Sequence, residues 1–311
     1  MSIKKNATCT ICEAMCGITL EISDAKQIER ITGDKLDPYS MGYICPKAQF
    51  LQTWQHSPSR LKRPMKKVYK NKDDATKRVN GEFVAISWKE AYAIVEKKLT
   101  AIRKTLGNDA IGLYQGNPNV HNLGTLLYGP RFARKLRTKN KFSASSVDQL
   151  PHHLVAHQLY GHQLAIPVPD VTRADMMIIM GANPLESNGS LMGVPGFQKV
   201  MLVAKKRGAK IIVIDPRRTK TAKLADRHHF IHPESDIFLL LGMLKVIFEQ
   251  NLANARWNGV SEEDTVKCRE LVKDISLEEC AKRTKMEVKD ILKLAISFAN
   301  AKSGFIYGRF G

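Results

Sequence analysis

The stretch Lys210-Ile-Ile-Val-Ile-Asp-Pro-Arg-Arg-Thr219 indicates the fold class, because an apolar run rich in β-branched residues ends directly in a polar turn. A second apolar run, Met176–Met180, is followed in the same way by Gly-Ala-Asn-Pro. Further strands are predicted at 110–114 and 304–307, and helices at Leu123–Leu136, 200–206, 236–250, 277–283 and 288–300. Short apolar strands that alternate with helices predict an α/β fold, with a parallel sheet covered by helices on both faces.

The residues that follow the predicted strands are candidates for ligand binding, since open parallel sheets bind ligands beyond the C-terminal ends of their strands. The chain contains neither G-x-G-x-x-G nor G-x-x-x-x-G-K-[ST], which disfavours a common NAD site and a P-loop ATPase. A nucleotide could still bind here, with Asp215 at a base or ribose edge and Arg217 or Arg218 at a phosphate.

Four of the six cysteines fall within the first 45 residues, in the pattern C-x2-C-x3-C-x28-C formed by Cys9, Cys12, Cys16 and Cys45. Clustered cysteines in a chain without a secretion signal more often bind metal than form disulfides. Zinc usually takes its cysteines as two C-x2-C pairs, and the second pair is missing here. Three local thiolates and one distant thiolate are a common set for an iron–sulfur cluster, so the spacing favours iron over zinc.

The sequence predicts two domains, 1–60 and 61–311. The first has a core too small to fold easily alone, so bound metal is expected to stabilise it. Alternating apolar residues in Gly17–Ile22 and 28–31 predict an antiparallel hairpin. A basic connector over 61–82 leads to a helix that begins with the capping box at Ser87 and ends at Gly107.

Composition excludes several classes of protein. Hydrophobic residues make up 43% and charged residues 25% of the chain, which is typical of a globular protein and not of a disordered, collagen-like or coiled-coil one. The sequence contains no run of about 18 apolar residues, which a membrane-spanning helix would need. The N-terminus has no apolar signal region, so we expect a cytoplasmic protein. The net charge of +19 (49 minus 30) favours anionic ligands, but aromatic residues are too few, at 7%, to suggest a nucleic-acid-stacking surface.

In this order, the motifs resemble the N-terminal part of the molybdopterin oxidoreductase family. Its members are bis-molybdopterin guanine dinucleotide enzymes such as formate dehydrogenases, nitrate reductases and thiosulfate or polysulfide reductases. The matching stretches are Cys9-Thr-Ile-Cys12-Glu-Ala-Met-Cys16-Gly17, Gly42-Tyr-Ile-Cys45-Pro46-Lys47, Arg60-Leu-Lys-Arg-Pro64, Ile86-Ser-Trp88-Lys-Glu90-Ala91, Gly181-Ala-Asn183-Pro184-Leu-Glu186-Ser187, Asp215-Pro216-Arg217-Arg218-Thr219-Lys-Thr221-Ala222 and Pro233-Glu-Ser-Asp236.

The resemblance implies a small N-terminal [4Fe–4S] domain followed by a Rossmann-like parallel-sheet domain. It implies that the four cysteines hold the cluster and that Lys47 lies between the cluster and the pterin as an electron relay. It also implies three loops at the dinucleotide. Their residues are Asn183, Glu186 and Ser187, then Asp215, Arg217 and Thr219, and finally Asp236.

The protein ligand of the metal does not follow from the resemblance. Relatives use cysteine, selenocysteine, serine or aspartate, whereas a gapless match puts Phe142 at that position. A one-residue slip offers Ser143, and Asp148 is a second candidate. Of the four histidines just downstream (His152, His153, His157 and His162), most are expected on a helix surface, and one could move protons near the metal.

The resemblance implies a catalytic subunit, or its N-terminal portion, of a molybdopterin-dependent oxidoreductase. Its cofactors would be a [4Fe–4S] cluster and Mo or W on bis-molybdopterin guanine dinucleotide, and its substrate a small redox molecule. Family members continue well beyond residue 311, so we expect an incomplete sheet domain that requires the missing C-terminal part or an electron-transfer partner protein. The alternatives are a non-catalytic iron–sulfur electron-transfer or scaffold relative without molybdenum, which Phe142 favours, and a zinc-ribbon nucleic-acid binder, which leaves the later motifs unexplained.

Overall fold

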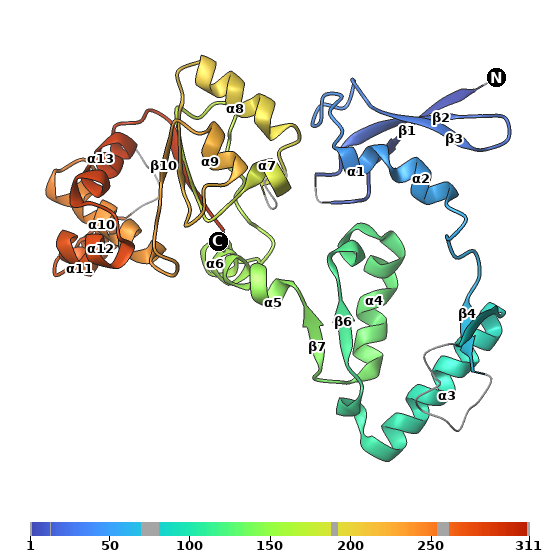
Figure 1. Cartoon of the computed structure of the whole chain (residues 1–311). Helices are drawn as coiled ribbons and strands as arrows, with labels where there is room; N and C mark the ends of the chain where they lie inside the picture. The colour runs from blue at the N-terminus through green and yellow to red at the C-terminus, as the bar shows by residue number, and fades with distance from the viewer. Residues whose placement is uncertain (1, 13, 70–80, 188–191, 254–260, 310–311) are drawn as a thin grey trace. The chain divides into compact units, whose positions relative to one another are not determined.

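The computed structural model describes the chain except for residues 1, 13, 70–80, 188–191, 254–260 and 310–311 (Figure 1). It divides into two compact units, Met1–Pro151 and His152–Gly311. Part of the predicted basic connector, 70–80, lies outside the described residues. No helix among the described residues is long and apolar enough to cross a membrane.

The first unit begins with a small antiparallel sheet, which contains the predicted hairpin. Its strands are β1 (Ile3–Thr8), β2 (Gly17–Ile22) and β3 (Ile28–Gly33), in the order β1-β2-β3. Two short helices follow, α1 (Pro46–Gln49) and α2 (Leu51–His56), and both contact β3. We call Ile3–His56 the cysteine module, since its small buried core includes two of the thiols.

The rest of the first unit has few buried residues among those that the structure describes. The hairpin β4 (Met65–Val68) and β5 (Glu82–Ala85) leads into α3 (Trp88–Leu106), which the Ser87 hydroxyl caps by accepting from Glu90 N. A 3₁₀ turn at Asn108–Ala110, β6 (Leu113–Gln115), a second 3₁₀ turn at Asn117–His121, α4 (Leu123–Leu136), β7 (Lys141–Ser143) and α5 (Ser145–Asp148) complete it, with β6 and β7 pairing in parallel.

A four-stranded parallel sheet forms the centre of the second unit, which confirms the predicted fold class. Its strands are β8 (Met176–Met180), β9 (Lys210–Ile214), β10 (Arg227–His229) and β11 (Gly304–Gly308), in the order β10-β9-β8-β11. Parallel pairing requires crossover connections, and helices provide them. They are α7 (Pro184–Ser187), α8 (Phe197–Lys206), α9 (Lys220–Leu224), α10 (Asp236–Glu249), α11 (Glu262–Val272), α12 (Leu277–Thr284) and α13 (Val288–Ala299), and α6 (Leu150–Tyr160) runs across the boundary of the two units.

Alternate residues of β8 and β9 face two separate hydrophobic cores. Met177 and Ile179 pack with Met201 of α8 on one face of the sheet, whereas Ile178 packs with Leu239 of α10 on the other. Figure 1 shows α8 on one side of the strands and α10, α12 and α13 on the other. Because side chains alternate along a strand, a sheet that is buried on both faces needs the continuous apolar runs seen in the sequence.

One local expectation differs from the structure. The predicted strand at 110–114 begins only at Leu113, because Asn108–Ala110 form a 3₁₀ turn. The amphipathic helix α3 has the predicted bounds, but none of its 19 residues is buried.

Candidate cofactor-binding site

The four N-terminal cysteines lie on loops that the small sheet positions. Cys9 follows β1 and Cys16 precedes β2, and Cys9 N donates to Cys16 O at 2.9 Å, which extends the strand pairing by one step. Between them the chain turns back on itself, since Met15 N donates to Cys12 O at 3.2 Å and Met15 has a φ of 40°. Cys45 caps the N-terminus of α1 with extended backbone angles, and Pro46 follows in the first turn.

The thiols form one electrostatic cluster. Burial raises the pKa of Cys16 to about 11, and the charges of Cys9, Cys12 and Cys45 add to the rise. The pKa of Cys9 is raised by burial as well, and by the nearby Cys12 and Cys45. Four thiolates that repel one another at a partly buried site require a compensating positive charge, and metal binding supplies it because metal ligands must be deprotonated.

The donor set fits a polynuclear iron–sulfur cluster. Tetrahedral zinc at about 2.3 Å from sulfur would hold its thiolates about 3.8 Å apart. Cys9 and Cys16 are buried in one small core, and Cys12 and Cys45 pack against it, so the four cysteines converge on one region. In a [4Fe–4S] cluster each thiolate binds a different iron, so the thiolates lie further apart around a common centre.

Lys47 lies two residues after Cys45, in α1, and its side chain is exposed. The turn holds its backbone in place, because Ala48 N donates to Cys45 O at 3.1 Å and Phe50 N donates to Lys47 O at 3.2 Å. The lysine is therefore fixed next to the thiols at its backbone, whereas its charged end is solvated.

In the second unit, the loops after β8 and β9 are joined by hydrogen bonds. Thr221 donates to the Asn183 amide oxygen from its hydroxyl at 2.5 Å and from its backbone N–H at 3.3 Å. The Thr221 hydroxyl also accepts from Leu185 N at 3.2 Å. On the exposed side of the same contact, Lys220 forms an ion pair with Glu186 at 2.6 Å. The structure thus brings together two loops that the sequence predicted separately as binding loops.

Several predicted residues serve the fold directly. Thr219 is buried, and its hydroxyl caps α9 by accepting from Ala222 N at 3.1 Å. The carboxylate of Asp215, also buried, accepts from Arg217 N at 2.7 Å and so fixes the turn after β9. Arg217 and Ser187 are exposed, and their side chains are available to a ligand.

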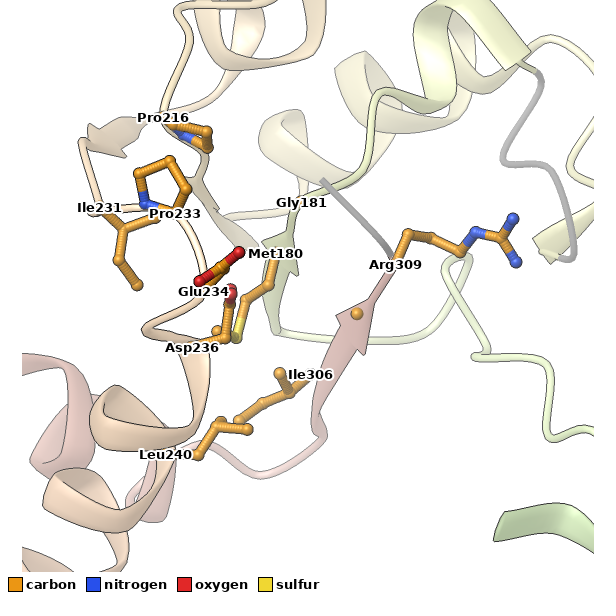
Figure 2. A pocket seen from close by; sticks show the side chains of 11 residues that line it. Met180, Gly181, Pro216, Ile231, Pro233, Glu234, Asp236, Leu240, Ile306 and Arg309 are labelled. Atoms are coloured by element: carbon orange, nitrogen blue, oxygen red, sulfur yellow. The ribbon is translucent and has the colours of Figure 1, made fainter. Parts of the chain in front are cut away.

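A pocket of about 850 Å³ opens where β8 and β11 end. Its lining comes from the strand ends and from the loops before α9 and α10, as Figure 2 shows; the residues are Met180, Gly181, Pro216, Ile231, Pro233, Glu234, Asp236, Leu240, Ile306, Gly308 and Arg309. This volume is within the usual range of small-molecule sites. The predicted Asp236 lines this pocket.

The charged groups of this pocket are of both signs. Glu234 has a left-handed backbone, with a φ of 66°, and precedes Asp236 at the start of α10. Arg309 extends away from these two carboxylates (Figure 2), and its Nη1 is buried without a hydrogen-bond partner among the described residues. The two carboxylates fit N–H donors of a ligand such as those on a nucleotide base.

The candidates for the metal ligand differ in their surroundings. Phe142 is 54% exposed on β7. Ser143 ends β7, and its carbonyl accepts from the Ser146 hydroxyl at 2.9 Å. Asp148, at the end of α5, has an Oδ1 that is buried without a hydrogen-bond partner among the described residues. Of these three candidates, only Asp148 offers a buried acceptor atom without a hydrogen-bond partner among the described residues.

Two of the four downstream histidines are held by hydrogen bonds. His152 Nε2 lies 3.1 Å from Gly308 O, and His153 Nδ1 lies 2.9 Å from Gln163 O. His157 and His162 are exposed. The expectation that most of them lie on a helix surface holds for His157, whereas His152 ties α6 to the end of β11.

Two residues with buried polar contacts or groups were not predicted from the sequence. Thr221 and Arg309 received no predicted role, although Thr221 lies within a quoted motif. Their roles depend on partners far away in sequence, as with Asn183 and Thr221, which are 38 residues apart. The burial of Thr221 is visible only in the structure, so the motif that contains it was the only sequence signal among those considered above.

A thiol cluster on a small sheet, in one chain with a parallel sheet whose strand-end loops form a nucleotide-sized pocket, defines a class of iron–sulfur proteins that also bind a dinucleotide-type cofactor. The sequence model of the molybdopterin oxidoreductase Fe4S4 domain matches residues 4–57, and that of molybdopterin oxidoreductase matches residues 60–308. The chain belongs to the molybdopterin oxidoreductase family, whose cofactors are a [4Fe–4S] cluster and Mo or W on a molybdopterin.

Curated relatives and solved structures agree with this assignment. The chain is 30% identical over 308 residues to the assimilatory nitrate reductase catalytic subunit of Bacillus subtilis, covering 96% of this chain and 40% of that one. It is 28% identical to formate dehydrogenase H of Escherichia coli, and the match covers 99% of this chain and 42% of that protein. The fold is similar to that of acetylene hydratase from Pelobacter acetylenicus, with a TM-score of 0.71 and 24% identity over 97% of this chain and 40% of that chain. The chain thus spans about two fifths of the length of these proteins.

Proposed function

We propose that this chain is the N-terminal, cofactor-binding part of a molybdopterin-dependent oxidoreductase. In this proposal, Cys9, Cys12, Cys16 and Cys45 hold a [4Fe–4S] cluster that exchanges electrons with Mo or W on bis-molybdopterin guanine dinucleotide. The single observation that carries it is the gathering of four cysteines at one small core, in a chain whose strand-end loops form a nucleotide-sized pocket. The metal centre would supply two-electron chemistry on a small substrate, with transfer of an oxygen atom or a hydride.

The proposed domains are 1–60 for the cluster and 61–311 for the dinucleotide, and the family matches at 4–57 and 60–308 support this division. The proposed dinucleotide residues are those of the three predicted loops, namely Asn183, Glu186, Ser187, Asp215, Arg217, Thr219 and Asp236. Asp236 would accept from N–H donors of the base in the pocket, and Arg217 would pair with phosphate. Asn183 and Thr219 would act by holding the loops in place.

Two residues are proposed to act at the metal and between the cofactors. The unused buried Oδ1 of Asp148 favours this carboxylate over Ser143 as the protein ligand of Mo or W. Lys47 would place a positive charge next to the cluster and favour its reduced form, since the turn fixes its backbone beside Cys45.

The partners proposed are a small redox substrate and a polypeptide, either a C-terminal continuation or an electron-transfer protein. The length of the relatives supports this, as this chain spans about two fifths of them. We also propose a cytoplasmic location, because clustered cysteines that bind metal instead of forming disulfides are typical of a reducing compartment.

A non-catalytic iron–sulfur electron-transfer or scaffold protein is the second candidate. The observation that favours it is Phe142, an exposed side chain that cannot ligate a metal, at the position where a gapless match expects the ligand. The cluster and Lys47 would keep their roles in such a protein, whereas Asp148 would have none.

Anaerobic purification of the chain, followed by analysis for Fe, S²⁻, Mo, W and Zn, tests the proposal. Four irons together with Mo or W support the oxidoreductase. Four irons with no Mo or W, even after coexpression with the molybdopterin biosynthesis proteins, support the electron-transfer protein. Zinc without iron contradicts both.

A further inference from the structure

The loop between β3 and Cys45 contains a hydrogen-bond network that none of the cofactor roles above requires. Its centre is Ser40, which is 3% exposed although it is polar. The Ser40 N–H and hydroxyl both donate to Asp37 Oδ2, at 2.6 and 2.5 Å. Buried polar groups normally have hydrogen-bond partners. With the two further bonds described next, Ser40 makes four hydrogen bonds through its side chain and backbone, which indicates a specific positioning role.

The network connects the two cysteine-bearing segments. On one side, Gly17 N, directly after Cys16, donates to Ser40 Oγ at 3.1 Å and to Asp37 Oδ2 at 3.3 Å. On the other side, Tyr43 N, two residues before Cys45, donates to Ser40 O at 2.8 Å. Ser40 is therefore a direct bridge between the backbone at Cys16 and the backbone at Cys45.

The approach is too close for any side chain at position 17. A Cβ on Gly17 would lie 2.5 Å from Asp37 Cβ, so glycine is required there. The same loop also lies near the thiols, because burial and then the charges of Cys16 and Cys12 raise the pKa of Tyr39. The bridge thus occupies the immediate surroundings of the thiol cluster.

We propose that Asp37 and Ser40 are positioning residues for the iron–sulfur cluster: they fix the separation of Cys16 from Cys45, and they hold the Gly17 amide so that it cannot donate to a cluster sulfur. Reduction potentials of such clusters depend on hydrogen bonds to the sulfurs and on nearby charge. The bridge therefore sets both the retention of iron and the potential of the cluster. This inference rests on the proposed function, since it assumes a cluster at the four cysteines.

The test uses the anaerobically purified full chain and two readouts, the rate of iron release to a chelator and the midpoint potential followed by EPR. Ser40→Ala removes the side-chain link of the bridge and should release iron about tenfold faster, because the Gly17 N–H loses the nearer of its two acceptors. It should also shift the potential to a more positive value, since the Gly17 N–H then keeps only its longer contact with Asp37 Oδ2, at 3.3 Å, and is less firmly held away from the cluster. Ser40→Thr, which keeps the hydroxyl, should restore much of the iron retention.

Asp37→Asn separates the charge from the geometry, because an amide oxygen can still accept from Ser40 and Gly17. It should retain iron within about twofold of the unaltered chain and shift the potential to a more positive value. Asp34→Asn is the matched control: Asp34 is in the same loop, and its carboxylate accepts from Leu36 N at 2.9 Å. Its loss of charge should shift the potential less than Asp37→Asn does.

Unchanged iron release and potential in Ser40→Ala would overturn the inference, and so would equal shifts in Asp34→Asn and Asp37→Asn. If Ser40→Ala does not fold, Asp37→Asn decides alone through its potential. An unaltered chain that takes up no iron would instead contradict the proposed function, so the two failures are distinguishable.

Discussion

In the parallel sheet, Met177, Ile178 and Ile179 are completely buried between two cores made of the unit's own side chains. Among the described residues of the cysteine module, the hydrophobic core has six buried residues, and two of them are the thiols Cys9 and Cys16. The parallel-sheet unit can bury its apolar surface without a ligand. In the cysteine module, the residues that would bind metal also form the core. A bound cluster should therefore stabilise the cysteine module far more than the parallel-sheet unit.

Removal of the metal should have the largest effect on the difference in stability between the cysteine module and the parallel-sheet unit. Stripping iron from the chain should lower amide hydrogen-exchange protection in β1–β3 by about 100-fold, because binding free energy is folding free energy for small metal-dependent modules. Protection in β8 and β9 should change by less than about twofold, since no ligand contributes to their cores. Equal loss of protection in both regions would show that they unfold as one unit.

A second way to break the cysteine module is to add one methyl group at Gly33. A Cβ there would lie 2.0 Å from Gly42 O, so Gly33→Ala must push away the segment that carries Cys45. We expect a loss of about 3 kcal/mol in stability, measured by thermal unfolding of the iron-loaded chain. Gly112→Ala, where a Cβ would meet nothing within 4 Å, is the control, and it should change stability by less than about 0.5 kcal/mol. Similar values for both variants would mean that the contact between residues 33 and 42 is not required.

In the parallel-sheet unit, the hydrogen bonds between the loops after β8 and β9 can be tested by changing Thr221. Thr221→Val keeps the shape of the side chain but leaves Leu185 N without its acceptor, and it should cost about 1–3 kcal/mol in denaturant unfolding. Thr221→Ser should recover most of this loss. Thr105→Val, at an exposed hydroxyl on α3 that donates to Ala101 O, serves as the comparison variant. If Thr221→Val is as mild as Thr105→Val, the loops are held by other contacts.

The smallest expected effect is the pH dependence at His229. Burial lowers the pKa of His229, only partly offset by Asp290 at 3.8 Å. The neutral form is thus favoured in the folded protein, so its contribution to stability is present above the ordinary pKa of about 6.5 and is lost as the pH falls through the lower folded pKa. His229→Gln should flatten the acid side of the stability curve, whereas His157→Gln, at an exposed histidine, should not. An unaltered acid limb in His229→Gln would show that other groups cause the acid sensitivity.

The sequence predicted the strands and helices whose burial is determined locally. The bounds of β8, β9 and α4 agree with the prediction, because continuous apolar runs and clear caps mark them. It missed β1 and β10, which contain Lys, Arg and His, since these strands form by pairing with β2 and β9 and not by their own apolar pattern. The loop residues of the site were predicted from motifs, but the hydrogen bonds of Asn183 with Thr221 and of Ser40 with Gly17 join residues 38 and 23 positions apart. Such pairs become visible only in the folded chain.

The measurement that tests the central claim most directly is the iron and sulfide content of cysteine variants purified without oxygen. The unaltered chain should hold about four irons and four sulfides and absorb near 400 nm, as thiolate-bound iron–sulfur clusters do. Cys12→Ala should lose this absorbance, whereas Cys268→Ala, at an exposed cysteine on α11, should keep it. Zinc in place of iron in the unaltered chain, or full iron content in Cys12→Ala, would contradict the account.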